Sequence, residues 1–213
     1  MHFMEYDTPI NNLIRKTLDI FLLSALWFIC CIPVFTIGAS TTALYYAGVK
    51  GLRKNRGYVI QNFFHAFRRN FLPAILLWLF YGFLAVVLYI CFMFALAIND
   101  PGLKFFMLTV YMFMGLIFLS MGCYSFPVLS RCSMKCRQII RFSFGLMIRH
   151  FPSTLLMVLI VVAVSMGMWS FPLFVFCLPA VGTLSFSLLM ERILLRYTPE
   201  NEKNNWYAEK DGE

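Results

Sequence analysis

The sequence predicts an all-α, polytopic membrane protein with six transmembrane helices. Of its 213 residues, 61% are hydrophobic and only 13% are charged, whereas a soluble domain is about half apolar and about a quarter charged. In addition, Asp, Glu, Lys and Arg are absent from four long stretches, residues 20–49, 70–99, 105–130 and 150–190. A membrane helix needs about 20 apolar residues, so every stretch can hold a crossing. The runs are apolar on every face, which favours helices over the alternating strands of a barrel.

The first charge-free stretch is too long for one upright helix and short for two. Its sequence "CCIPVFTIGAS" predicts a turn between Pro33 and Gly38, with one helix over about 17–36 and a returning helix over about 38–54. Arg15 and Lys16 before the stretch favour an even number of crossings, because a basic loop also follows it. The alternative is a single tilted crossing, which gives five crossings and an N-terminus outside.

The returning helix carries small residues at every fourth position. Such a stripe allows two helix backbones to approach closely in a bilayer, and neighbouring hydroxyl groups can bond to carbonyl groups nearby. The alternative is a chance alignment of common residues. The predicted packing stripe is Ala39, Ala43, Ala47 and Gly51.

The later stretches predict two hairpins. The turn "NDPGLK" joins residues 70–99 to residues 105–130, so we expect a hairpin whose tip lies outside the cell. Pro172 and Pro179 divide the last stretch, which predicts helices over about 152–171 and 175–196. We therefore expect one transmembrane domain over 1–196 and a polar, disordered cytoplasmic tail over 197–213.

Two loops hold most of the positive charge. Residues 50–69 and 131–149 contain eleven of the eighteen Lys and Arg residues and no acidic residue. Because positive loops stay on the cytoplasmic side, this distribution predicts a multi-pass protein of the plasma membrane rather than a nucleic-acid-binding protein.

Both basic loops end in a similar segment, 80 residues apart. Ile60, Phe64, Phe67 and Phe71 step along one helix face, as do Ile140, Phe144, Met147 and Phe151. We expect two amphipathic helices at the cytoplasmic interface, which either anchor in lipid headgroups or form a docking surface. The candidate contact residues are Phe64, Phe67, Arg68, Arg69, Asn70, Phe71, Arg141, Phe144, Arg149 and Phe151.

Residues for catalysis or ion coupling are scarce. The sequence contains no recognisable catalytic triad, carboxylate pair, phosphate loop or HExxH motif, which predicts a non-enzymatic protein without cofactor or metal. Ion-coupled transporters usually need buried ionisable side chains. Asp19, Glu191 and Arg192 fall at predicted helix ends, where we expect them to be solvated at the interface.

Two motifs resemble those of the YesL-like family of bacterial membrane proteins of unknown function. The first is P-x-x-T-x-G at Pro33, Thr36 and Gly38, within "WFICCIPVFTIGASTTALYY"; the second is F-x-x-x-F-x-x-N-F, starting at Phe63 and ending at Phe71. The resemblance extends over most of the chain. It implies an integral membrane protein, often encoded beside sugar ABC importers and carbohydrate-degrading enzymes, and assigns no residue a role.

These observations lead to two hypotheses. The first is an accessory or regulatory membrane protein of carbohydrate uptake, which contacts subunits of a sugar ABC importer through the basic segments. The alternative is a small transporter or permease-like protein that moves a polar solute itself. Self-association into a homo-oligomer is left open by the sequence.

Overall fold

The computed structural model describes residues 9–53, 58–131, 136–170 and 177–197, and all of its regular elements there are helical. The all-α class is therefore confirmed. The elements are α1 (Pro9–Cys31), the 3₁₀ turn η1 (Val34–Thr36), α2 (Ile37–Ala47), the π-helical segment η2 (Gly48–Arg53), α3 (Val59–Arg69), α4 (Phe71–Leu96), α5 (Pro101–Arg131), α6 (Cys136–Arg149), α7 (Phe151–Ser170) and α8 (Leu178–Tyr197). Pro172 and the predicted tail beyond Tyr197 lie outside the described residues.

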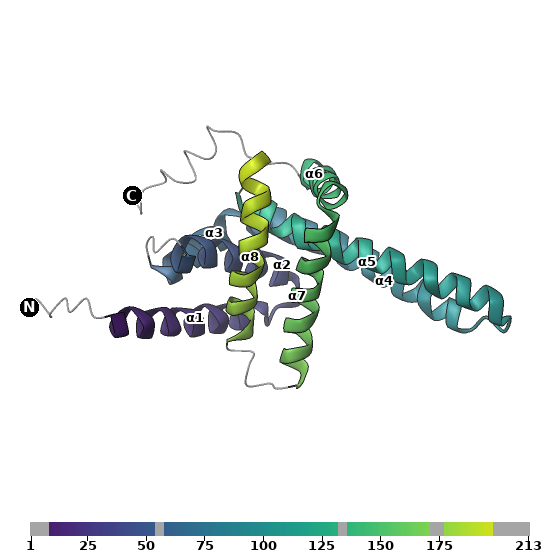
Figure 1. Ribbon diagram of the computed structural model, residues 1–213, viewed down its shortest axis with the longest axis horizontal. Helices are drawn as coiled ribbons and strands as arrows, with labels where there is room; N and C mark the ends of the chain where they lie inside the picture. The colour runs from purple at the N-terminus through teal and green to yellow at the C-terminus, as the bar shows by residue number, and fades with distance from the viewer. Residues whose placement is uncertain (1–8, 54–57, 132–135, 171–176, 198–213) are drawn as a thin grey trace, which may run out of the picture.

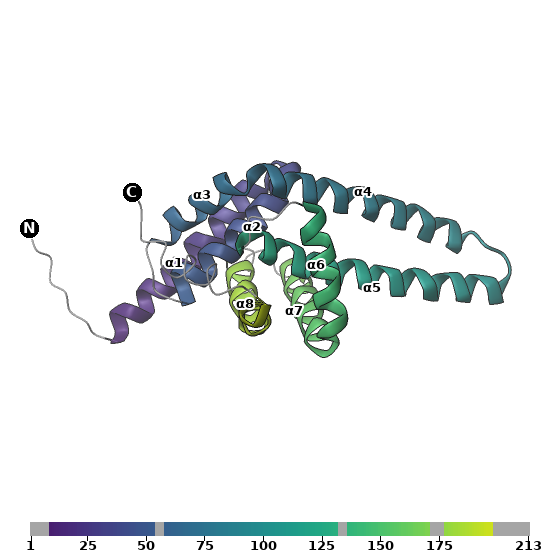
Figure 2. The ribbon, with the colours of Figure 1, turned by 90° about the horizontal axis from the view of Figure 1, so that it is seen from above.

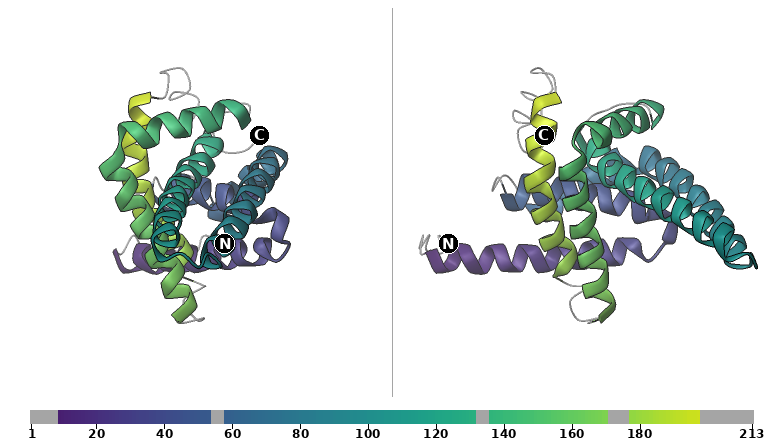
Figure 3. Two further views of the ribbon diagram at one scale, coloured as in Figure 1. Left: turned by 90° about the vertical axis from the view of Figure 1, so that its right-hand side faces the viewer. Right: turned by 45° about the vertical axis from the view of Figure 1, so that its right-hand side comes forward.

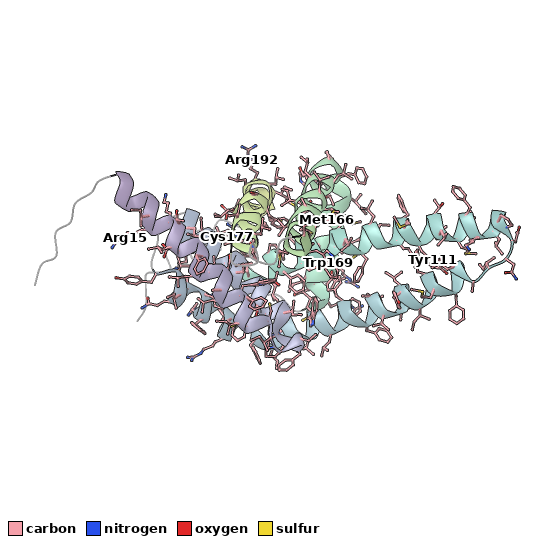
Figure 4. The ribbon with its side chains drawn as sticks, turned by 90° about the horizontal axis from the view of Figure 1, so that it is seen from below. Arg15, Tyr111, Met166, Trp169, Cys177 and Arg192 are labelled. Atoms are coloured by element: carbon pink, nitrogen blue, oxygen red, sulfur yellow. The ribbon has the colours of Figure 1, made fainter. Side chains whose placement is uncertain are left out.

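Three of these helices are long and apolar enough to cross a membrane, namely α4, α5 and α7. They occupy the second, third and fourth charge-free stretches. Their outward-facing side chains are large and apolar, as the sticks around Tyr111 in Figure 4 show for the α4–α5 hairpin. Phe83 and Phe105 of this hairpin, for example, are 70% and 74% exposed. Such surfaces suit lipid rather than water.

The first charge-free stretch contains two antiparallel helices. The chain turns between Cys31 and Ile37, and α2 then runs back along α1. The Ser40 hydroxyl donates a hydrogen bond to the Cys30 carbonyl (3.0 Å), and further along the Trp27 indole N–H donates to the Thr41 hydroxyl (3.5 Å). The returning helix is shorter than predicted, since α2 ends at Ala47 and continues as a π-helical segment to Arg53.

The long helices form three hairpins that point in different directions. In Figure 1, α1 runs horizontally, α4 and α5 slant to the right, and α7 and α8 run vertically. Figure 2 shows from above that the α4–α5 hairpin projects away from the remaining helices. Helix α3 precedes α4, and α6 precedes α7. Both α3 and α6 lie near the region from which the hairpins diverge (Figure 1).

Helix α2 is the hub of the structure. Every residue from Gly38 to Ala47 except Thr41 is buried. Ala39 and Tyr45 pack into a core with α4, α5, α6, α7 and α8. Ala43 and Tyr46 pack into a second core with α1, α3 and α8. A helix that is apolar on nearly every side is expected to be covered on every side.

Candidate functional site

The P-x-x-T-x-G motif builds the turn between α1 and α2. Pro33 has an extended conformation (φ −75°, ψ 112°) and follows the last turn of α1, where carbonyl groups have no partner within the helix. The Thr36 hydroxyl lies 2.6 Å from the carbonyl oxygens of both Cys30 and Pro33 and can donate to either one. The threonine thus takes the place of the missing backbone donors.

Gly38 allows α2 to approach α4 closely. A Cβ atom at this position would lie 2.8 Å from the Ala74 carbonyl oxygen and 2.8 Å from the Trp78 Cβ. Real Cβ atoms do not come this close to backbone, so any larger residue would push the two helices apart. The glycine of the motif is therefore required by packing and not by backbone conformation.

The predicted stripe of small residues is buried throughout. Ala39, Ala43 and Ala47 have no exposed surface, and a Cβ atom on Gly51 would lie 2.9 Å from the Val59 Cγ2. The stripe does not define a separate face, however, because most other residues of α2 are buried as well.

Two elbows precede α4 and α7. The first elbow is α3 with the bend at Asn70, the second is α6 with the bend at His150, and both have the same backbone hydrogen-bond pattern. At Asn70 and at His150 the helix bends, while the hydrogen bonds from residue i to i−4 continue on both sides of the bend. A proline follows each bend, Pro73 and Pro152. Because proline lacks an N–H group and clashes with the preceding turn, neither helix can continue straight.

Burial also repeats between the elbows at the interval of 80 residues. The buried pairs are Val59 and Ile139, Phe63 and Ser143, Ala66 and Leu146, Ala74 and Thr154, and Leu77 and Met157. Exposed positions match too, since Phe64 and Phe144 are 40% and 45% exposed. The two segments therefore share several buried and exposed positions, which the sequence similarity alone suggests only weakly.

The predicted contact residues divide into exposed and packed groups. Arg68, Arg69, Arg141, Arg149, Phe144 and Phe151 are exposed, Phe67 and Phe71 are half-buried against the core, and Asn70 is buried. The aromatic residue that anchors α3 is Phe63, which is fully buried and stacks on Phe67 with ring centroids 6.1 Å apart. The predicted face through Phe64 instead points partly outward. The start of α6 lies against the first bend, because the Cys136 thiol is 3.7 Å from the Pro73 carbonyl oxygen.

A buried ion pair is the feature that sequence reasoning missed. Arg131, the last residue of α5, pairs with Glu191 of α8, and their side chains are only 4% and 5% exposed. The prediction that Glu191 is solvated at an interface is thus wrong, because α5 covers it. Arg192, by contrast, is exposed. A signal was available: Arg131 and Glu191 are the first charges after two long apolar stretches that end on the same side.

A second buried cation, Lys50, lies in η2, directly after the end of α2. Lys50 is 7% exposed. Its ammonium group lies 3.3 Å from the Tyr46 hydroxyl and 5.5 Å from the centre of the Tyr46 ring. Both contacts stabilise a buried ammonium group, the ring contributing a cation–π interaction.

An apolar cavity of about 510 Å³ lies among the six helices α1, α2, α4, α5, α7 and α8. Its wall includes residues of both the α4–α5 and the α7–α8 hairpin, which diverge from one another in the right-hand view of Figure 3. Aromatic rings dominate its wall, with Trp27, Tyr45, Trp78, Tyr81, Phe118, Phe126 and Phe186 among them. In the described residues no group of three or more His, Cys, Asp or Glu side chains could hold a metal ion.

Residues 20–92 match the family model described as a protein of unknown function, DUF624. The match covers about a third of the 213 residues. It includes the turn motif, α2, α3 and most of α4, and therefore the first elbow but not the second. Neither the curated proteins nor the solved structures contain a match to this chain.

Proposed function

We propose that this chain is a six-crossing protein of the bacterial plasma membrane that acts as a non-enzymatic accessory component of carbohydrate uptake. In this proposal the two elbows lie on the cytoplasmic side and receive an acidic segment of a sugar importer subunit. The observation that carries the proposal is the repetition of one elbow, with a bend at the equivalent residue, several matching buried positions and exposed arginines in both copies.

The charge of the elbows favours an acidic partner. Arg68 and Arg69 are exposed on α3, and Arg137, Arg141 and Arg149 are exposed on α6. Residues 58–70 and 136–150 contain no acidic residue. Exposed complementary charge steers association and selects partners more than it increases affinity. An acidic protein segment that reaches both elbows at once would use the whole surface.

Six crossings are supported by the antiparallel pairing of α1 with α2 and by the charge balance of α8. The carboxylate of Glu191 would be costly in a bilayer, but its ion pair with Arg131 removes much of that cost. The α2 helix is short, yet it is covered by its neighbours and needs little contact with lipid. The cytoplasmic side is inferred from the positive charge of both elbows.

The link to carbohydrate uptake rests on the resemblance to YesL-like proteins. The DUF624 match is compatible with that resemblance and assigns no activity of its own. Membership of the YesL-like family and association with a sugar importer are therefore parts of this proposal.

The test is a pull-down from the native host grown on complex carbohydrate. The protein carries a C-terminal tag, and the amount of importer subunits per tagged chain is measured after mild detergent extraction. In the elbow variant, Arg68→Gln with Arg141→Gln, we expect the importer subunits to be lost. The matched control removes two exposed basic residues of α1, Arg15→Gln with Lys16→Gln, and should retain them.

Two other results would count against the proposal. An unchanged importer yield in the elbow variant would reduce the elbows to headgroup contacts. Recovery of the tagged chain alone, or only with further copies of itself, would remove the accessory role.

Transport by the chain itself is the second candidate, since the cavity offers space for a solute, but its apolar wall counts against a polar one. The experiment is solute flux into liposomes that contain only the purified protein. Flux that depends on the protein, together with a pull-down that recovers no importer, would favour transport over the accessory role.

A further inference from the structure

We infer that the apolar cavity among α1, α2, α4, α5, α7 and α8 binds one hydrocarbon chain of a membrane lipid. This inference goes beyond the proposed docking function and does not depend on it. It follows from the chemistry of the cavity wall, from its shape and from its position.

The three aliphatic hydroxyl groups of the wall are already hydrogen-bonded to their own helices. Thr41 donates to the Ile37 carbonyl (2.7 Å), Ser165 donates to the Val161 carbonyl (2.8 Å), and Thr183 donates to the Pro179 carbonyl (2.7 Å). These donors are therefore not available to a ligand. A sugar would bury many hydroxyl groups that need partners, and each unpaired group has a substantial cost. The wall thus disfavours a sugar in spite of its aromatic rings.

The same wall suits a hydrocarbon chain. The cavity volume of about 510 Å³ lies within the range of about 300–1,000 Å³ that is typical of ligand pockets. Leu44, Val161, Val164 and Met168 add aliphatic surface to the aromatic rings. The lining atoms of an empty space lack partners for dispersion contacts. Methylene groups of a lipid chain would supply these partners and so stabilise the wall.

The position of the cavity gives a lipid chain access from one side. The rings of Tyr45 and Phe186 line the cavity and meet edge to face, with centroids 6.3 Å apart. Beyond them, about one helical turn further along α5 and α8, lies the ion pair of Arg131 and Glu191. This end is therefore closed by aromatic rings and charge. The α4–α5 and α7–α8 hairpins diverge from one another (Figure 3), and three of the wall helices are the candidate membrane spans.

Two glycines leave room in the wall. A Cβ atom on Gly82 of α4 or on Gly122 of α5 would have no heavy atom within 4 Å. Both residues line the cavity. Larger side chains at these positions would fill the cavity without displacing a neighbour. Gly115, two turns away on α5, also has open space around it, but it lies outside the cavity wall, and it therefore provides a matched control.

The experiment measures quenching of tryptophan fluorescence by a phospholipid brominated on its acyl chain. Trp169→Phe and Trp206→Phe leave Trp27 and Trp78, both in the cavity wall. The protein is placed in nanodiscs with and without the brominated lipid, and aqueous acrylamide is titrated in parallel. The same measurements are made with Gly82→Leu, Gly122→Leu and Gly115→Leu in this background, after thermal unfolding has shown that each variant is folded.

We expect strong quenching by the brominated lipid and weak quenching by acrylamide. The Gly115→Leu control should keep this pattern, whereas Gly82→Leu and Gly122→Leu should each lose most of the quenching by lipid. Equal quenching by lipid in all three variants would show ordinary bilayer contact and overturn the inference. Strong quenching by acrylamide would also overturn it, because the cavity would then be filled with water, as a polar transport site requires.

Discussion

The buried ion pair between α5 and α8 should be critical for stability. In the variant Glu191→Gln the side chain keeps its size, but Arg131 stays buried without its counter-charge. Removing one partner of a buried ion pair typically costs about 3–5 kcal/mol. The side chains of this pair are only 4% and 5% exposed, so water can compensate little of that cost and the upper part of the range applies.

This cost translates into a large shift of the unfolding temperature. For a chain of this length, 1 kcal/mol corresponds to about 2–4 °C, so Glu191→Gln should lower the unfolding temperature by on the order of 10 °C. The measurement is thermal unfolding of the detergent-purified protein, followed by intrinsic fluorescence. Arg192→Gln, which removes the adjacent exposed charge, is the control and should have little effect.

The double variant Arg131→Met with Glu191→Leu completes the test. Replacing both partners of a buried pair by apolar residues is often neutral or stabilising, so the double variant should recover most of the loss. Additive losses would refute the pairing, because independent sites add while coupled sites do not. A Glu191→Gln shift no larger than that of Arg192→Gln would refute the burial argument.

Three further substitutions test the turn motif and the contacts between helices in the same unfolding assay. Gly38→Ala should cost about 1–3 kcal/mol by overpacking, whereas Gly122→Ala, which meets open space, should not destabilise; equal effects would contradict the close approach. Thr36→Val should cost about 1–2 kcal/mol because a helix-end carbonyl loses its donor, and Thr36→Ser should be tolerated. Tyr124→Phe should cost about 0.5–1.5 kcal/mol, since its hydroxyl lies 2.8 Å from that of Thr154; no loss would argue against this contact.

The positions of the helices follow from the sequence for a simple physical reason. Charges are costly in an apolar environment, so the long charge-free stretches coincide with long apolar helices. The "NDPGLK" turn separates two of these stretches, and Pro33 and Pro179 lie where two others are divided, whereas Pro127 lies inside α5. The boundaries of α4 and α7 are of this kind, since both start at bends that a proline follows.

The buried face of α3 could not be read from the sequence. One face carries Ile60 and Phe64, and the neighbouring face carries Val59 and Phe63. In a soluble protein the apolar face is the core face, but near a bilayer apolar side chains suit both the core and the lipid. Periodicity therefore indicated an amphipathic helix without showing which aromatic ring is buried, and Phe63 is the one.

Contacts between distant segments were only weakly indicated by the sequence. Arg131 and Glu191 are 60 residues apart, and each alone looks like an ordinary charge at a helix end. The cavity is harder still to predict, because its wall residues come from six helices and the open space at Gly82 or Gly122 depends on how the hairpins diverge. Local pattern carries no information on that divergence.

The turn motif is better explained by packing than by ligand binding. Pro33 follows the end of α1, Thr36 supplies a donor to the last carbonyls of that helix, and Gly38 lets α2 approach α4. Each of these tasks concerns the placement of α2, which contributes to both cores. The motif residues Pro33, Thr36 and Gly38 do not line the cavity, whose wall on α2 begins at Thr41. Substitutions in the motif should therefore lower the stability of the whole helical assembly, whereas substitutions at Gly82 and Gly122 should change what the cavity holds and leave the assembly intact.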